Sequence, residues 1–158
     1  MSKISKRFYY LVSTFFFLYF NITVSDMIVK SLRGHGFFAT LKGKILDLTY
    51  VTNTGAAFSI LDEYPVLLNI VGILSVVFIF YEVFRYTQKM STTTIFWSAI
   101  LTAGILGNLY ERIHYGYVRD YIDIKFIDFP VFNISDIFIT VSVIVLLFII
   151  IKTHFKKR

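Results

Sequence analysis

Two aspartates, Asp120 and Asp136, flank the same connection between two apolar stretches, and Asp136 falls about one turn inside the second stretch. A carboxylate at membrane depth is energetically unfavourable and indicates function by default. If the stretches are consecutive antiparallel helices, both carboxylates can lie at the same depth relative to the membrane. Because such a pair cannot readily ionise twice, it supplies a base to activate water and an acid to polarise a carbonyl. Spacing alone also allows an acidic surface loop, since Asp123 and Asp128 lie nearby.

Two other polar sets fall on helical spacing. Gly104, Asn108 and Arg112 are four residues apart, which predicts a small, polar and cationic stripe on one helix face. That stripe is equally typical of helix packing. Asp26 and Lys30 are spaced i, i+4 at the end of the first apolar stretch, so they can form a local ion pair with no further role.

Several other chemistries are excluded by composition. The chain has no cysteine, which removes disulfides, thiol nucleophiles and cysteine-ligated zinc. Its three histidines, His35, His114 and His154, fall in separate segments, so we expect no metal site. There is no His-Glu-x-x-His, Gly-x-Ser-x-Gly, phosphate-loop or dinucleotide pattern, and we expect no cofactor.

The elements that must position these residues are membrane helices. Of the 158 residues, 56% are hydrophobic and 16% charged, which is too apolar for an ordinary soluble domain. We predict an all-α fold with residues 1–158 in a single integral membrane domain. Apolar runs of membrane-spanning length predict four transmembrane helices at about 8–29, 64–84, 90–113 and 133–152.

The connections between these helices are expected outside the cytoplasm, at about 30–63 and 114–132. Residues 45–51 alternate between two faces, as a strand with one apolar face does. We therefore expect a small extracytoplasmic β-sheet on the membrane surface.

Charge predicts the orientation. The net charge is +6, with +3 in residues 1–7, +1 in 82–89 and +4 in 152–158, so the remainder is negative overall. The positive-inside rule then places both termini and the 82–89 link in the cytoplasm. We interpret the basic residues as membrane anchors and expect no nucleic-acid partner.

Three motifs resemble the lipoprotein signal peptidase (signal peptidase II) family. They are YVTNTGAAFS at 50–59, GNLYERI at 107–113 with GYVRDYID at 116–123, and FNISD at 132–136. The resemblance covers nearly the whole chain. It implies four membrane helices, a small extracytoplasmic sheet and a short surface helix. It also implies a membrane aspartyl endopeptidase that removes prolipoprotein signal peptides by cutting before a diacylglyceryl-modified cysteine.

The same resemblance assigns residues. Asp120 and Asp136 match the catalytic pair, and the other matched positions shape the site or the substrate path: Asn53, Gly55, Asn108, Arg112, Asn133, Asp26 and Lys30. The expected partners are a diacylglyceryl-modified prolipoprotein and membrane lipids, with the chain acting as a monomer. The expected location is the bacterial inner or cytoplasmic membrane, as a multi-pass protein with its active site at the outer face.

Three departures from the family pattern bear on the site. Glu111 stands where aspartate is usual, Arg119 where valine is common, and Tyr121 where phenylalanine is common. We expect Glu111 to orient or pair with Arg112. Arg119 either lowers the pKa of the neighbouring Asp120 or contacts lipid phosphate.

Two other functions are kept as alternatives. A small transporter or proton channel would spread ionisable residues through the membrane depth, whereas here they gather near one face. A non-catalytic lipoprotein-binding protein would keep the same architecture, and substitution of the two aspartates separates it from an enzyme.

Overall fold

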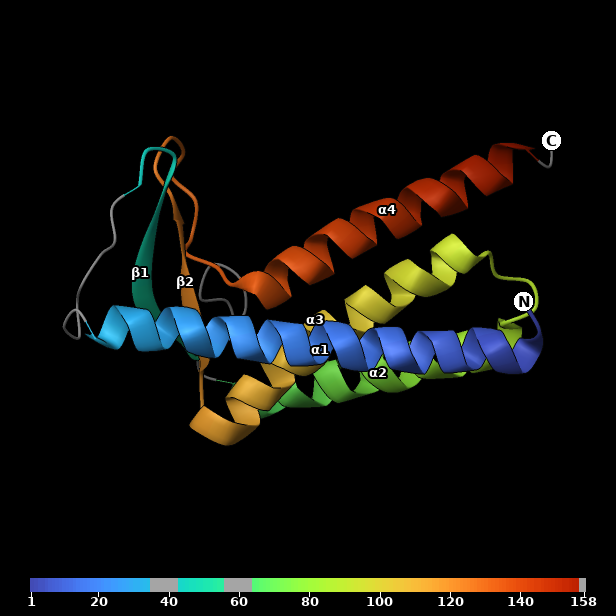
Figure 1. Cartoon of the computed structure of the whole chain (residues 1–158), viewed down its shortest axis with the longest axis horizontal. Helices are drawn as coiled ribbons and strands as arrows, with labels where there is room; N and C mark the ends of the chain where they lie inside the picture. Colours follow the sequence, from blue (N-terminus) through green and yellow to red (C-terminus); the bar gives the residue numbers. More distant parts are fainter. Residues whose placement is uncertain (35–42, 56–63, 157–158) are drawn as a thin grey trace.

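The computed structural model describes residues 1–34, 43–55 and 64–156. Four helices in it are long and apolar enough to cross a membrane, which confirms the predicted all-α architecture. Figure 1 shows them with a two-stranded sheet, and the chain order is α1 (Lys3–Gly34), β1 (Leu46–Asn53), α2 (Pro65–Tyr86), α3 (Thr92–Tyr115), β2 (Val118–Ile124) and α4 (Ile134–Lys156).

Helix α3 is the central helix of the bundle. Half of its most apolar window is buried inside the protein, against 6% for α2 and 11% for α4, whose side chains face outward as lipid-facing residues do. Two glycines allow this packing. A Cβ at Gly104 would lie 2.8 Å from the backbone oxygen of Ser135, and one at Gly107 would collide with the side chains of Asn21 and Ser135. Helices α1 and α4 therefore approach α3 closely only because it has glycine there.

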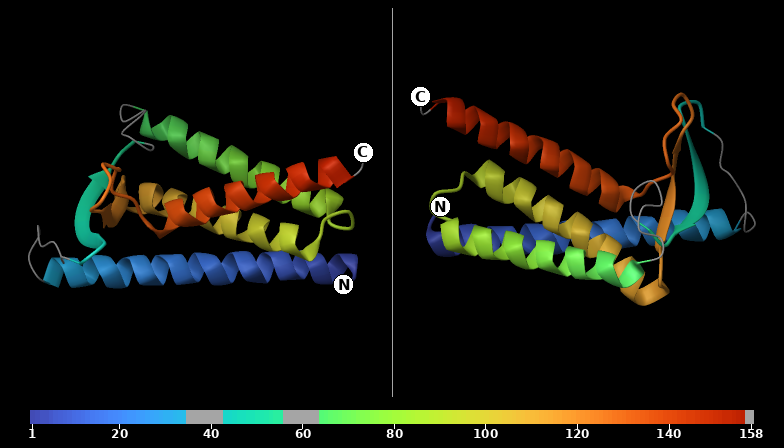
Figure 2. Two further views of the ribbon diagram at one scale, coloured as in Figure 1. Left: turned by 90° about the horizontal axis from the view of Figure 1, so that it is seen from above. Right: turned by 180° about the vertical axis from the view of Figure 1, so that it is seen from behind.

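Both termini lie at one end of the bundle, together with the α2–α3 connection, and the sheet stands across the other end (Figures 1 and 2). At the end that holds the termini, the basic residues Lys6 and Arg7 belong to α1. Lys6 Nζ donates to the Met90 carbonyl at 2.6 Å, and Arg7 Nη2 donates to the Phe84 carbonyl at 2.5 Å. These bonds join the first turns of α1 to the last turn of α2 and to the α2–α3 connection, and α1 begins at Lys3, before the predicted residue 8.

The sheet pairs β1 with β2 antiparallel, and Val51 stands opposite Asp120. The strand predicted at 45–51 is confirmed with a small shift, and the pairing has an irregularity between Leu48 and Val51. A second, shorter contact joins β2 to the residues before α4. The amide of Ile122 donates to the carbonyl of Phe132 at 2.8 Å, and the reverse bond is 3.1 Å long. This contact places the start of α4 beside β2.

The C-terminal part of α1 packs against the sheet. Val29 and Leu32 of α1 pack with Tyr121 of β2, and all three are almost fully buried. No further helix occurs in the described ranges. Any surface helix in residues 35–42 or 56–63 lies outside the described part of the chain.

Candidate active site

Asp120 lies in β2 with its side chain buried. Only 2% of the residue is exposed. Its two oxygens accept hydrogen bonds from Asn53 Nδ2 and Asn133 Nδ2, each 2.9 Å long. Burial raises the pKa of Asp120 to about 7; the two amide bonds oppose this effect, and the nearby negative charge of Asp136 adds to it. Asp120 therefore exchanges a proton near neutral pH.

Asp136 lies in the first turn of α4, where it belongs to a reciprocal cap. Its backbone amide donates to Asn133 Oδ1 at 3.1 Å, while its Oδ2 accepts from the backbone amide of Asn133 at 3.1 Å. This is the geometry of a capping box, which fixes the side chain and satisfies the helix N-terminus. The other carboxylate oxygen accepts from Asn108 Nδ2 of α3 at 2.8 Å.

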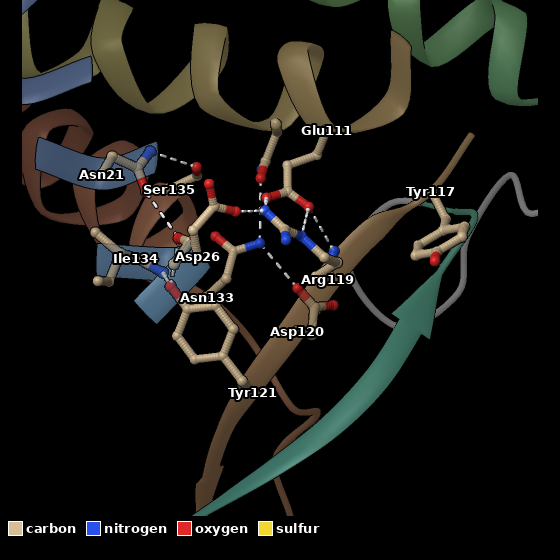
Figure 3. Close-up of polar contacts among 12 residues, drawn as sticks. Asn21, Asp26, Glu111, Tyr117, Arg119, Asp120, Tyr121, Asn133, Ile134 and Ser135 are labelled. Carbon is tan, nitrogen blue, oxygen red and sulfur yellow. Dashed lines mark hydrogen bonds and ion pairs between the residues drawn. The ribbon is translucent and has the colours of Figure 1, made fainter. Parts of the chain in front are cut away.

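Asn133 connects the two aspartates. Its side-chain amide donates to Asp120 Oδ1 at 2.9 Å and to Asn108 Oδ1 at 3.2 Å, and its backbone amide donates to Asp136. Figure 3 shows Asn133 reaching towards Asp120. One asparagine, 3% exposed, thus ties both carboxylates to α3.

Both aspartates line a cavity of about 690 Å³. Its polar lining also includes Asn53, Asn108 and Arg112. Most of its wall is apolar and comes from α2, α3, α4 and the segment before α4, including Leu68, Val71, Ile105, Leu109, Ile127, Phe129, Val131, Phe132 and Ile137. A cavity with one polar end and apolar walls suits an apolar peptide whose scissile bond reaches two carboxyl groups.

Gly55 is held beside this cavity through its backbone. Arg112 Nη2 donates to the Gly55 carbonyl at 2.7 Å, and the Gly55 amide donates to Asn53 Oδ1 at 3.0 Å. Arg112 therefore fixes the end of β1, and through Gly55 it orients the amide that bonds Asp120.

The structure brings together seven of the nine predicted site residues: Asn53, Gly55, Asn108, Arg112, Asp120, Asn133 and Asp136. Asp26 and Lys30 are not among the residues that line the cavity. Asp26 Oδ1 accepts from Arg119 Nη2 at 2.8 Å, so in the described chain its ion-pair partner is Arg119 and not Lys30. Lys30 is exposed.

The expectation for Glu111 is wrong. Glu111 pairs with Arg119 and not with Arg112, because the extra methylene lets its carboxylate reach β2. The Arg119 side chain is 4% exposed and bonded to Glu111 and Asp26, and the charged groups with the largest effects on the pKa of Asp120 are Asp136 and Arg112. Hydrogen bonds from Arg119 to Glu111 and Asp26 outweigh its burial and raise its own pKa.

The sequence did not predict one hydrogen-bond network near the site, apart from noting the tyrosine at 121. The Tyr121 hydroxyl lies 2.7 Å from Ser25 Oγ and accepts the backbone amide of Ile134 at 3.3 Å. Asn21 Nδ2 donates to Ser135 Oγ at 2.7 Å. These contacts link α1 to the first turn of α4, and Figure 3 shows Tyr121 beside Ile134.

Metal ligands do not gather in the described part of the chain. Across residues 1–34, 43–55 and 64–156, no group of three histidine, aspartate or glutamate side chains is placed to hold an ion.

Comparison with known proteins gives consistent matches. A family model described as signal peptidase (SPase) II matches residues 15–152. A lipoprotein signal peptidase of Caldicellulosiruptor bescii is 43% identical over 133 residues, covering 82% of this chain and 85% of that protein. A lipoprotein signal peptidase of Lactobacillus johnsonii is 30% identical over 150 residues, covering 91% and 92%.

A solved structure has the same fold. It is described as a bacterial membrane enzyme structure obtained by the in meso method at 2.3 Å resolution. The two chains superpose with a TM-score of 0.81 at 25% identity, over 94% of this chain and 91% of the other.

Proposed function

The chain belongs to the signal peptidase II family, and from that membership we infer that it is a multi-pass bacterial membrane peptidase that removes signal peptides from prolipoproteins. We propose that its catalysis is of the aspartic type, with Asp120 and Asp136 as the reacting pair. The observation that carries this proposal is the sharing of one cavity by two carboxylates that a single asparagine connects.

The proposed reaction needs no covalent intermediate. The ionised carboxylate takes a proton from a water molecule as the water oxygen attacks the scissile carbonyl carbon. The protonated carboxyl polarises the carbonyl oxygen, and a proton then passes to the leaving amine as the C–N bond breaks. A pKa of about 7 supports Asp120 as the partner that starts with the proton.

The amides around the pair take separate roles in this proposal. Both N–H bonds of the Asn133 side chain are used, one on Asp120 and one on Asn108, so Asn133 positions the carboxylates and does not stabilise an oxyanion. Asn53 and Asn108 each give one N–H to an aspartate within the described chain. Their second N–H is the candidate donor to the substrate carbonyl.

The cavity supports a proposal for how the substrate binds, and the charge distribution supports one for the orientation. Its apolar walls fit the signal segment, and we propose that the acyl chains of the diacylglyceryl-cysteine stay among membrane lipids. Because the site lies at the end opposite the basic termini, the positive-inside rule places it at the outer face. We propose that one chain, as a monomer in a single membrane domain, carries the whole site.

The test is cleavage of a diacylglyceryl-modified prolipoprotein by purified protein, followed by gel shift. Asp120→Asn and Asp136→Asn should each abolish cleavage, because asparagine cannot exchange the proton. The double variant should be about as inactive as either single variant. Activity should survive EDTA.

Two nearby carboxylates provide the controls. Asp128 is exposed and Asp123 is half-buried, and neither is bonded to the pair in the described chain. Asp123→Asn and Asp128→Asn should therefore cleave at close to the wild-type rate. Normal turnover by both Asp120→Asn and Asp136→Asn would exclude the aspartic mechanism.

A further inference from the structure

Arg119 is a buried cation on the strand that carries Asp120, yet it lies outside the cavity. Its side chain is 4% exposed, and it is not among the residues that line the cavity. Neighbouring side chains on a strand point to opposite faces. Arg119 therefore lies behind β2, on the side away from Asp120, where the mechanism proposed above does not use it.

Arg119 is bonded to two helices at once. Its Nε and Nη2 donate to the two carboxylate oxygens of Glu111 at 2.7 and 2.5 Å, and its backbone amide donates to Glu111 Oε2 at 3.1 Å. Nη2 also donates to Asp26 Oδ1 of α1 at 2.8 Å. The guanidinium lies 4.3 Å from the ring centre of Tyr115. Figure 3 shows Arg119 between Glu111 and Asp26.

This arrangement fixes β2 in two directions. The parallel bonds to Glu111 set the orientation of the guanidinium plane as well as its distance, because both groups are planar. The hydrogen bond from the Arg119 backbone amide to Glu111 fixes the position of β2 along the axis of α3. The hydrogen bond to Asp26 prevents the Arg119 side chain from rotating about its contact with Glu111. The Cα of Arg119 is therefore held by α1 and α3 together, and Asp120 is the next residue.

Helix α3 holds both strands at this level with two consecutive residues. Glu111 binds β2 from behind through Arg119, while Arg112 binds the end of β1 through the Gly55 carbonyl. The carboxylate of Asp120 depends on both anchors, since one of its amide donors, Asn53, belongs to β1.

We propose that Arg119 is a positioning residue for Asp120, holding β2 so that this carboxylate meets Asn53, Asn133 and the reacting water; the proposal rests on the aspartic mechanism above. Stability alone does not account for such a pair. Replacing a buried ion pair with apolar side chains of similar volume is often neutral or stabilising. Accurate placement of Asp120 does account for the Arg119–Glu111 pair, because a displacement of about 1 Å at a catalytic group can slow a reaction about 100-fold.

The double variant Glu111→Leu/Arg119→Met separates these roles, because it removes both charges of the buried pair and leaves the half-exposed Asp26 solvated. Its folded yield and melting temperature in detergent should stay close to wild type. Its kcat on a diacylglyceryl-modified prolipoprotein should fall about 10- to 100-fold. Its KM should change much less, since the apolar walls of the cavity are intact.

The pH profile is a second readout that a purely structural role would not move. A looser β2 admits water to Asp120, so the alkaline limb of the kcat profile should move to lower pH. The charged groups that face Asp120, namely Asp136 of α4 and Arg112 of α3, are unchanged in the variant.

The control is the other ion pair of the sheet, in which Lys125 Nζ lies 3.3 Å from Asp47. Lys125→Met removes an ion pair at the far end of β2 and should leave kcat and the pH profile unchanged. Arg119→Lys keeps the charge but cannot make two parallel bonds to Glu111. Its kcat should fall while its folded yield stays like that of wild type. This variant tests the proposal if the double variant does not fold.

The proposal is overturned if folded Glu111→Leu/Arg119→Met or Arg119→Lys has the wild-type kcat and pH profile, or if its loss only follows the unfolded fraction. Asp120→Asn is assayed in parallel. If that variant cleaves normally, the aspartic mechanism itself fails. If it is inactive while the Arg119 variants are normal, only the positioning role fails.

Discussion

Replacing Asp120 with asparagine should remove the pH dependence of stability that this carboxyl causes. The carboxyl has a pKa of about 7 in the folded protein against 3.8 for an ordinary aspartate. The folded state therefore holds a proton between these values that the unfolded state has released, and wild-type stability falls as pH rises from about 4 to 7. At 1.36 kcal/mol for each pH unit, the loss amounts to about 4 kcal/mol.

Asparagine carries no charge, so the variant lacks this decline, but it introduces a mismatch. Both Asp120 oxygens accept N–H donors, from Asn53 and Asn133. An asparagine amide must place its own N–H₂ against one of them, at a penalty of about 1–3 kcal/mol. Neither neighbour is free to turn its amide over, because Asn53 Oδ1 accepts from Gly55 and Asn133 Oδ1 accepts from Asp136.

The two effects predict a crossover. At pH 4 Asp120→Asn should be less stable than wild type by about 1–3 kcal/mol. By pH 8 its relative stability should have improved by up to about 4 kcal/mol, so that it equals or exceeds wild type. Unfolding in mixed micelles can be followed by fluorescence of Trp97, the single tryptophan. Asp128→Asn is the exposed control and should follow the wild-type pH dependence. A constant difference between Asp120→Asn and wild type from pH 4 to 8 would refute the buried, proton-bearing carboxyl.

Three other outcomes are expected. Gly107→Ala should lower stability by about 1–3 kcal/mol, measured as a fall in melting temperature, because its methyl group collides with Asn21 and Ser135. Gly34→Ala is the control and should not, because within the described residues no atom lies within 4 Å of the new methyl. Tyr121→Phe should lower stability by about 1–2 kcal/mol, since the Ser25 hydroxyl and the Ile134 amide lose their partner; an unchanged melting temperature would contradict that role. In this cysteine-free chain, Asp128→Cys should react with an impermeant maleimide in intact cells and Gln88→Cys only after lysis, and the opposite pattern would reverse the orientation.

Hydropathy was sufficient to find the helices because each has to satisfy its backbone internally across an apolar layer. The limits of α1 were harder to predict. Lys6 and Arg7 interrupt the apolar pattern but belong to the helix, and their side chains donate to carbonyls of the α2–α3 connection and of the last turn of α2. That contact joins residues about 80 positions apart, and no local pattern encodes it.

The strand β2 was not predicted, although the sheet was. Apolar and polar residues alternate at the start of β1, and its residues are partly or fully exposed, whereas the first four residues of β2, Val118 to Tyr121, are all buried. Arg119 and Asp120 are polar residues in that buried run, and they satisfy their charges on opposite sides of the strand. A period-two pattern is absent when both faces are covered, so only tertiary structure identifies the strand.

Spacing alone predicted Asp120, Asp136, Asn108 and Arg112 as candidates, the resemblance added Asn53, Gly55 and Asn133, and the structure gives a physical reason why the motif at 107–112 is so compact. Along α3, successive positions of 107–112 turn by about 100° each and so face different elements. Gly107 receives α1 and α4, Asn108 binds Asp136, Glu111 binds Arg119 of β2, and Arg112 binds Gly55 after β1. One and a half turns of a central helix thus contact α1, α4 and both strands. A residue inserted here would rotate every later contact by about 100° away from its partner.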